Sequence, residues 1–376
     1  MKRLLGAGVL AGVFTAPAFA QSNLTMYGII DAGIDYVNNS GGHSLFQMQN
    51  GVAQGSRWGL KGIEDIGGGT RVVFTIENGF NVFNGKTGNN GAIFGRQAYL
   101  GFANDAWGTL TLGRQYDPVV NMIQPTTFNG QGGAFFSHPS DVDNTDNSIR
   151  VNNAVKYVSP NWGGLTGSVM YGFGGVAGSF RKNSTIAAGA SYANGPLYLG
   201  AAYFYARDPA DQFTDANFQP NGTPGISNGE GVFGYVGHPA NMQTMAAGGS
   251  YKLGDAQIGL SFSDVRFDDA SGIAGNTVRF DNYEAWAVYH LSPMATIGGG
   301  YTFTLGKIDF NGAKPKYHQG NLLFDYALSK RTDTYLMAIY QYAAGGANAD
   351  IYQAFAGSES TTRSQVALRI GMRHKF

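Results

Sequence analysis

Apolar and polar side chains alternate along many short segments of this chain. In the segment 365–376, every second residue from Val366 to Phe376 falls on one largely apolar face, and the residues between them form a polar face. Successive side chains of a β-strand point to opposite faces, so this period of two predicts a strand with one apolar and one polar side. The alternation recurs at residues 24–35, 165–173, 197–205 and 319–328. The pattern therefore predicts an all-β chain.

The breaks between these segments alternate between short and long. The short breaks are residues 66–69, 160–164, 194–196, 253–255 and 292–293. The long stretches, rich in Asn, Asp and Gly, are residues 37–55, 81–93, 117–148, 207–244, 267–280 and 344–361. A sandwich in water has no reason to place every second connection on a long loop. A transmembrane barrel does, because it has short periplasmic turns and longer extracellular loops.

The N-terminus has the pattern of an export signal. Lys2 and Arg3 precede an apolar run, which ends in the small residues of the segment 18–20. A membrane anchor is the alternative, but the apolar run is too short to cross a bilayer. We therefore expect residues 1–20 to be a cleaved signal peptide and residues 21–376 to form the mature domain, a multi-pass protein of the bacterial outer membrane.

Chain length sets the size of the barrel. The 376 residues, less the signal, predict about sixteen antiparallel strands at roughly 22 residues for each strand and its connection. In lipid every backbone group must be paired, so strands with one polar face can cross a membrane only in a closed barrel. About sixteen strands enclose a water-filled lumen, so the polar faces are expected to line water and the apolar faces to meet lipid.

Composition excludes several other classes. The 43% hydrophobic content excludes disorder, and the 57 glycines lack the three-residue period of collagen. The 25 basic and 25 acidic residues balance, and removal of Lys2 and Arg3 leaves a net charge of about −2. The chain therefore lacks the basic field that a nucleic-acid partner would require. Cysteine is absent, which excludes disulfides and thiolate metal sites.

No residue pattern points to catalysis. The six histidines are scattered along the chain, and no two of them have the helical spacing of a metal site. Glycine clusters such as residues 172–178 lack the following helix that phosphate binding requires. We therefore expect no catalytic residues, no cofactor and no bound metal.

Five segments, taken in order, resemble a known family. They are the opening strand 24–33, the hairpin 57–69, the segments 95–99 and 108–116, and the closing strand 369–376. Together they resemble the Gram-negative trimeric general diffusion porins of the beta-proteobacterial type, and the resemblance runs over the whole chain. It implies a sixteen-stranded transmembrane antiparallel β-barrel whose third extracellular loop, here residues 117–148, folds inward to constrict the pore.

The resemblance also implies a function and partners. The channel would pass ions and small hydrophilic solutes by passive diffusion, as a homotrimer embedded in outer-membrane lipid and lipopolysaccharide. The terminal aromatic residue, Phe376, would be read by the barrel-insertion machinery. A substrate-specific channel and an adhesin that uses the loop 207–244 stay open as alternatives.

In that family, arginines on the barrel wall face acids of the inward loop. The wall residues that match this cluster by position are Arg57, Arg96 and Arg150, and Lys61 and Arg114 are further wall candidates. The candidate loop acids are Asp117, Asp141, Asp143 and Asp146. Strand parity places Arg57, Lys61 and Arg150 on polar faces. Arg96 and Arg114 share the parity of apolar neighbours, so either a bulge re-aims them or they lie above the lipid band. A narrow ring of charges focuses the field, and we expect a mild anion preference despite the net charge.

Deletion of Phe376 is expected to lower the amount of folded protein in the outer membrane, because this residue closes the apolar face of the last strand and matches the insertion signal of the family. The measurement is the yield of heat-modifiable trimer on electrophoresis of outer membranes. Wild-type yield from the deletion would contradict this role.

Overall fold

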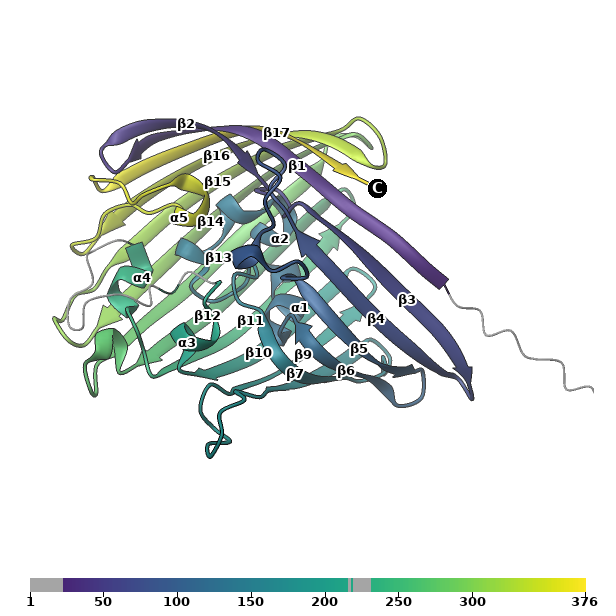
Figure 1. Cartoon of the computed structure of the whole chain (residues 1–376). Coiled ribbons are helices and arrows are strands. Elements are labelled where there is room, and N and C mark those ends of the chain that lie inside the picture. Colours follow the sequence, from purple (N-terminus) through teal and green to yellow (C-terminus); the bar gives the residue numbers. More distant parts are fainter. Residues whose placement is uncertain (1–22, 216–217, 219–230) are drawn as a thin grey trace, which may run out of the picture.

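The chain folds into one closed antiparallel β-barrel (Figure 1). The structure is a computed structural model, and it describes residues 23–215, 218 and 231–376. The predicted signal peptide lies outside the described residues. The strands are β1 (Asn23–Ser40), β2 (His43–Asn50), β3 (Arg57–Gly67), β4 (Thr70–Gly79), β5 (Gln97–Asn104), β6 (Gly108–Gln115), β7 (Val151–Val158), β8 (Leu165–Gly172), β9 (Thr185–Asn194), β10 (Leu197–Arg207), β11 (Asn241–Leu253), β12 (Ala256–Asp268), β13 (Thr277–His290), β14 (Ala295–Ile308), β15 (Lys316–Ala327), β16 (Thr332–Ala344) and β17 (Ser364–Lys375).

The helical segments all lie in connections between strands. The α-helices are α1 (Pro118–Met122), α2 (Asn129–Gly132), α3 (Pro209–Gln212), α4 (Gly231–Val236) and α5 (Gln353–Ala356). The 3₁₀ segments are η1 (Asn89–Gly91), η2 (Gln124–Thr126), η3 (Ala134–Phe136), η4 (Pro139–Asp141) and η5 (Ala270–Gly272). Within the described ranges, no helix has the length and apolar character needed to span a membrane.

The seventeen strand segments occupy sixteen positions around the barrel. β2 pairs with the second half of β1, and β3 pairs with its first half, so β2 and β3 together form one interrupted position. Residues 51–56 form the break between them. β1 pairs with β17 over residues 29–37, which closes the sheet. The expected sixteen-stranded barrel is confirmed, but the long loop expected over residues 37–55 is wrong, because most of that stretch continues the wall.

The two ends of the barrel differ as the connection lengths predict. The turns at one end are short, as at residues 68–69 and 254–255, whereas loops such as 116–150 and 345–363 lie at the other. Figure 1 shows α3, α4 and α5 at the loop end, and the start of β1 and the C-terminus at the turn end. By the rule for outer-membrane barrels, the loop end is extracellular and the turn end is periplasmic.

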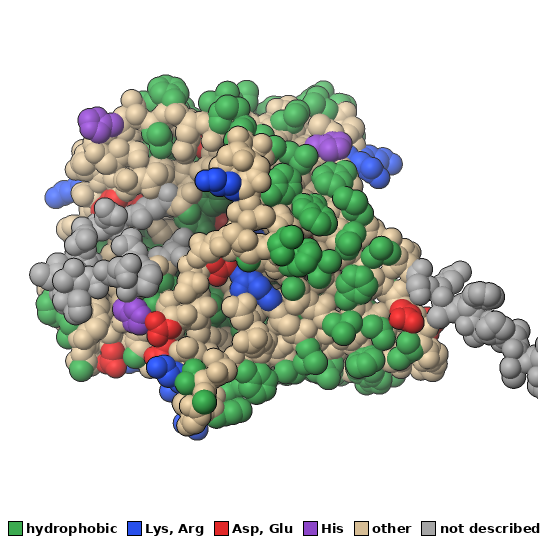
Figure 2. Space-filling model, viewed as in Figure 1, with side chains coloured by type: hydrophobic (Ala, Val, Ile, Leu, Met, Phe, Trp, Pro, Cys, Tyr) green, Lys and Arg blue, Asp and Glu red, His purple; other side chains and the backbone are tan. Residues whose placement is uncertain are grey.

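The outer wall is apolar and the interior is polar. Leu260, Leu322 and Ile370 are more than half exposed on the outside of the barrel, while their polar neighbours face inward. Hydrophobic side chains gather on the outer wall over the strands at the right of Figure 2. This arrangement inverts that of a water-soluble protein, and it suits a surface that contacts lipid.

The wall is taller on one side than on the other. β5 to β8 have 8 residues each, whereas β13 and β14 have 14. Fourteen residues in a strand tilted by about 40° rise about 35 Å, which exceeds the ~25 Å height of the apolar band. The ends of the long strands therefore extend beyond the hydrocarbon region.

A buried ion cluster lies inside the seam where the barrel closes. Arg369 on β17 forms ion pairs with Asp35 (2.6 Å) and Asp31 (3.1 Å) on β1. The Tyr335 hydroxyl, from β16, donates to Asp31 (2.5 Å) and accepts a hydrogen bond from Arg369 Nε (2.9 Å). One cluster thus joins β1 to β16 and β17, and β1 meets β17 only because the sheet closes.

Replacing Arg369 by Met is expected to cost about 3–5 kcal/mol of stability, because it leaves two buried carboxylates without their cation. Tyr335→Phe is the matched control and should cost only about 1 kcal/mol, since it removes hydrogen bonds and no charge. The measurement is the urea midpoint of unfolding, followed by tryptophan fluorescence. Equal losses from both variants would contradict a dominant role for the charge.

Candidate pore constriction

The connection between β6 and β7 folds into the barrel instead of extending into solvent. Its first helix, α1, contacts β8, β9 and β10 from the inside. The wall carries glycine, with no side chain, at positions where the loop lies against it. A Cβ atom on Gly200 would stand 2.2 Å from the Met122 carbonyl oxygen, and one on Gly248 would stand 2.1 Å from Thr126 Oγ1. Glycine at these two positions allows backbone and loop to come close together.

Three phenylalanines attach the middle of the loop to the far wall. Phe128, Phe135 and Phe136 are fully buried, and the rings of Phe128 and Phe136 stack with centroids 4.6 Å apart. Trp286 of β13 packs beside Phe128 and donates from its indole nitrogen to the Thr126 carbonyl oxygen (2.7 Å). Apolar packing and a hydrogen bond to the backbone therefore fix this part of the loop.

The loop tip also meets the break in the wall. The Ala134 amide donates to the Val52 carbonyl oxygen (2.7 Å), between β2 and β3. Gly133 has a φ of +109° and lies so close to Val52 that a Cβ would clash with it at 2.2 Å. The interruption of the second strand position thus supplies a backbone acceptor that an unbroken strand would use for its own ladder.

A buried histidine joins the loop to the barrel through charge. His138 Nδ1 lies 2.6 Å from Asp143 of the loop, and its Nε2 lies 2.9 Å from Glu284 of β13. Asp143 also accepts from Ser263 of β12 (2.5 Å). Burial alone would lower the pKa of His138, but the Asp143 and Glu284 carboxylates outweigh it and hold that pKa well above the ordinary value. The imidazolium therefore persists at neutral pH.

The four acids expected in the loop have different surroundings. Asp117 caps α1 by accepting from the Val119 amide (2.7 Å), and Asp141 accepts from the backbone amides of residues 146 and 148. Asp143 lies in the His138 cluster. These three carboxylates are buried and shape the loop. Asp146 is the loop acid that lines the open space between loop and wall.

That space is a cavity of about 590 Å³ between the inward loop and the barrel wall. Arg57 lines it from the start of β3, Arg96 and Arg150 line it from positions just before β5 and β7, and Asp146 lines it from the loop. The other charged residues that line it are Asp215 and Arg373. Neither Arg57 nor Arg150 forms an ion pair with any residue that the structure describes. Two guanidinium groups thus face the cavity without a carboxylate in contact.

Arg96 points inward although its parity in the sequence is that of apolar residues. It lies at a bend immediately before β5, so the alternation of the strand does not apply to it. Its Nε donates to Glu77 of β4 (2.8 Å), and the Tyr116 ring lies 5.7 Å from its guanidinium carbon. Glu77 also accepts from the hydroxyls of Tyr27 and Tyr116, each at 2.8 Å.

Arg114 and Lys61 lie beside the cavity without lining it. The β6–β7 register shifts between residues 113 and 115, which re-aims Arg114. Arg114 donates to the Gly95 carbonyl oxygen (2.6 Å) and forms an ion pair with Asp215. Lys61 shares the inner face of β3 with Arg57, and its Nζ lies 4.5 Å from the centre of the Tyr27 ring.

Several residues of the site were missed in the sequence. Glu77 alternates with Thr75 on the inward face of β4, next to the strand that carries Arg57. The same alternation rule, applied to acidic residues of the wall, would have identified it. Arg373 likewise alternates with apolar residues on β17. His138 and Asp215 lie in irregular loops, where no period predicts the direction of a side chain.

Comparison with known proteins identifies the family. Residues 6–348 match the family described as Gram-negative porin. The chain belongs to this porin family. Over its full length the porin is 30% identical to an outer membrane porin protein of Bordetella pertussis, with 100% of each chain covered. It is 27% identical to outer membrane porin protein 32 of Delftia acidovorans, with 100% of this chain and 99% of that one covered.

Solved structures share the fold. An anion-selective porin from Comamonas acidovorans matches with a TM-score of 0.74 at 23% identity, over 95% of this chain and 100% of that one. OmpT of Vibrio cholerae in its trimer form matches with a TM-score of 0.68 at 15% identity, over 94% and 99%. Family membership confirms that the porin is an outer-membrane diffusion channel and not an enzyme.

The His138 attachment is expected to fail in alkaline solution. The pKa of His138 is higher in the folded protein than in the unfolded chain, where it is about 6.5. The stabilisation by the imidazolium is therefore complete below about pH 6.5, and it is lost as the pH rises through the higher folded value. Single-channel current noise should therefore be lowest below about pH 6.5 and should increase as the solution is made progressively more alkaline. His138→Gln should show the high noise throughout. Ser263→Ala, which keeps the charges, is the control, and equal noise in both variants would count against the ion cluster.

Proposed function

We propose that Arg57, Arg96 and Arg150, with Asp146 across the gap, form the selectivity constriction of a general diffusion channel with a mild anion preference. The observation that supports this proposal is the cavity that these four residues share, in which Arg57 and Arg150 form no ion pair with any described residue. The loop 117–148 is its inner boundary in this proposal, and Asp117, Asp141 and Asp143 keep the loop in shape.

The electrostatics of a narrow lumen support the same assignment. Fixed charges at low-dielectric walls act on a passing ion more strongly than dispersed surface charge does, so the arginines can outweigh a net charge of about −2. Arginines on one side and Asp146 on the other produce a transverse field, which favours polar solutes over apolar ones. Arg114 and Lys61 would add to the field from beside the cavity.

The proposal includes export and assembly. Residues 1–20 would be removed on export, leaving residues 21–376 in the outer membrane, and Phe376 would be read during barrel insertion. We further propose a homotrimer within outer-membrane lipid and lipopolysaccharide. The outer face of β1 and β2 supports a subunit interface, because Met26 and Phe46 are 63% and 73% exposed there. OmpT of Vibrio cholerae, which shares the fold, has a trimer form.

Replacing Arg57 and Arg150 together by Ser tests the constriction. A unit charge about 6 Å from an ion in water contributes ~0.7 kcal/mol, and two such charges contribute ~1.4 kcal/mol. Loss of the pair should therefore lower the anion-to-cation permeability ratio about tenfold or more. The measurement is the zero-current potential of planar bilayers under a KCl gradient.

The matched control is Lys330→Ser with Arg331→Ser, which removes two exposed charges from a periplasmic turn. It should leave the potential unchanged, and both double variants should retain the trimer on electrophoresis. An unchanged potential in the Arg57 and Arg150 variant, at wild-type conductance, would remove these residues from the constriction.

A further inference from the structure

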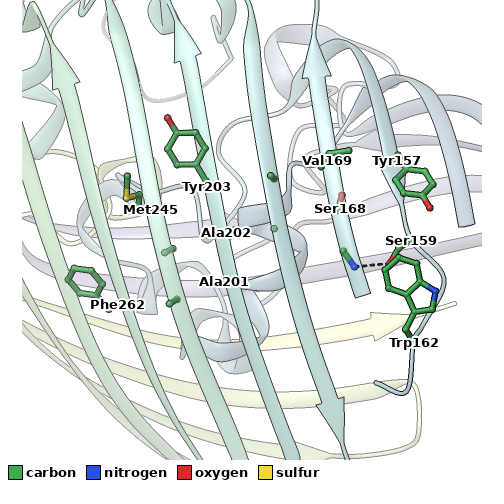
Figure 3. Close-up of a pocket in the computed structure, with 15 residues that line it drawn as sticks. Tyr157, Ser159, Trp162, Ser168, Val169, Ala201, Ala202, Tyr203, Met245 and Phe262 are labelled. Atoms are coloured by element: carbon green, nitrogen blue, oxygen red, sulfur yellow. Dashed lines mark hydrogen bonds between the residues drawn. The ribbon is translucent and has the colours of Figure 1, made fainter. Parts of the chain in front are cut away.

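A short segment that follows β10, residues 208–215, turns into the lumen. Tyr203 of β10 stands at an apolar groove on the outer wall (Figure 3), so the next residue, Phe204, faces the inside of the barrel. Phe213 of the segment packs against Phe204, and the two ring centroids lie 6.1 Å apart. Both side chains are buried. Apolar packing therefore holds this inward segment against the inner face of β10.

The end of the inward segment contacts a different part of the wall. The side-chain amide of Asn90, in η1, donates to the Thr214 carbonyl oxygen (2.7 Å). Arg114 of β6 forms an ion pair with Asp215, and Asn89 Nδ2 lies 3.4 Å from the same carboxylate. Because β7, β8 and β9 lie between β6 and β10 in the sheet, the inward segment spans these strands from within.

The strands around Asp215 carry no acid of their own. β5 to β11 are seven adjacent strands, and none of them contains Asp or Glu. A carboxylate can therefore reach this side of the lumen only from a connection between strands. Asp215 comes from such a connection, and its side chain is only 10% exposed.

Arg114 fixes Asp215 beside the backbone of Arg150. Besides binding Asp215, its guanidinium donates to Asn152 Oδ1 (2.6 Å) and to the Arg150 carbonyl oxygen (3.4 Å). Asp215 lines the same cavity as the three arginines of the proposed constriction. Among the described residues, its one ion pair is with Arg114, so the carboxylate lies near the Arg150 guanidinium without binding it.

The charge of Asp215 changes the balance of the whole cavity. Within the part of the chain that the structure describes, Asp146 and Asp215 are the two carboxylates that line it. Arg57 and Arg150 face the cavity without a carboxylate in contact, and Arg114 would join them if Asp215 were neutral. A fixed negative charge at this place therefore opposes the field that attracts anions.

We propose that Asp215 is a selectivity-determining residue of the channel, supplied to the constriction by a segment other than the inward loop 117–148. It cancels the charge of Arg114 and opposes that of Arg150, and it thereby keeps the anion preference mild. The inference rests on the proposed constriction and deepens it, because part of the ion selectivity comes from a second connection between strands.

Neutralising Asp215 in the full mature porin tests the proposal. Asp215→Asn keeps the size of the side chain and removes its charge. It should raise the anion-to-cation permeability ratio about threefold, which is the effect of one unit charge about 6 Å from an ion in water. The measurement is the zero-current potential of planar bilayers under a KCl gradient centred on about 0.1 M, where charges about 10 Å apart still interact.

The matched control is Asp211→Asn, which removes an acid from the same segment. Asp211 is 47% exposed and pairs with His238 (3.0 Å), away from the cavity. This variant should leave the zero-current potential unchanged. All variants should retain the trimer on electrophoresis, which shows that the barrel has folded.

Two further variants separate charge from structure. Asp215→Ser should raise the ratio as Asp215→Asn does, whereas Asp215→Glu restores the charge and should return the ratio toward the wild-type value. At about 1 M KCl the screening length falls to ~3 Å, so the shift should shrink. An unchanged potential in both neutral variants, an equal shift in Asp211→Asn or Asp215→Glu, or a rise in conductance at both salt concentrations without a shift would each overturn the proposal.

The double variant of Arg57 and Arg150, measured in the same bilayers, separates this inference from the proposed function. A lower ratio in the arginine variant, with no change in the neutral Asp215 variants, would reject the role of Asp215 alone. No change in any of them would reject the proposed constriction and this inference together. A shift in the Asp215 variants alone would reject the arginine assignment and leave that of Asp215 in place.

Discussion

The absence of water in the hydrocarbon layer is the constraint on which this structure depends. No backbone N–H or C=O can remain unpaired there, so the sheet must close, and β1 must meet β17. Closure brings the first and last parts of the chain together and creates the seam in which Arg369 is buried with Asp31 and Asp35. Burying charged groups costs free energy of desolvation. The cluster nevertheless lies at the contact between β1 and β17, which are far apart in sequence and therefore cannot be paired by local interactions.

A closed barrel of this size leaves an interior too wide for its own side chains to fill. The inward loop fills part of this interior, and it is held there by interactions that are typical of a soluble protein. Phe128 and its neighbours form a small apolar core against Trp286, and His138 adds a fully satisfied polar cluster with Asp143 and Glu284. Among the residues that the structure describes, Arg57 and Arg150 opposite the loop have no carboxylate in contact, and this imbalance leaves the remaining space charged.

The parts that could be predicted from sequence are those with a period. Alternation gave the strands, their outward faces and the inward direction of Arg57, because each follows from the geometry of an extended chain. It left the directions of both Arg96 and Arg114 open, because a bend exempts Arg96 from the rule and the bulge beside Arg114 has no sequence signature. The loop acids show the same limit. Nothing in the spacing of Asp141, Asp143 and Asp146 tells which carboxylate turns toward backbone amides and which toward the lumen.

The break between β2 and β3 has a consequence for how such channels diversify. Elsewhere in the wall, inserting or removing a residue shifts a strand by one position and turns every side chain beyond it to the opposite face. Residues 51–56 stand outside the ladder, and Val52 there holds the loop tip through the Ala134 amide. Insertions or deletions in this short stretch can shift the point where the loop is anchored, while the side chains of the flanking strands keep their orientation. The width of the pore can therefore vary among related porins without any change in the barrel wall.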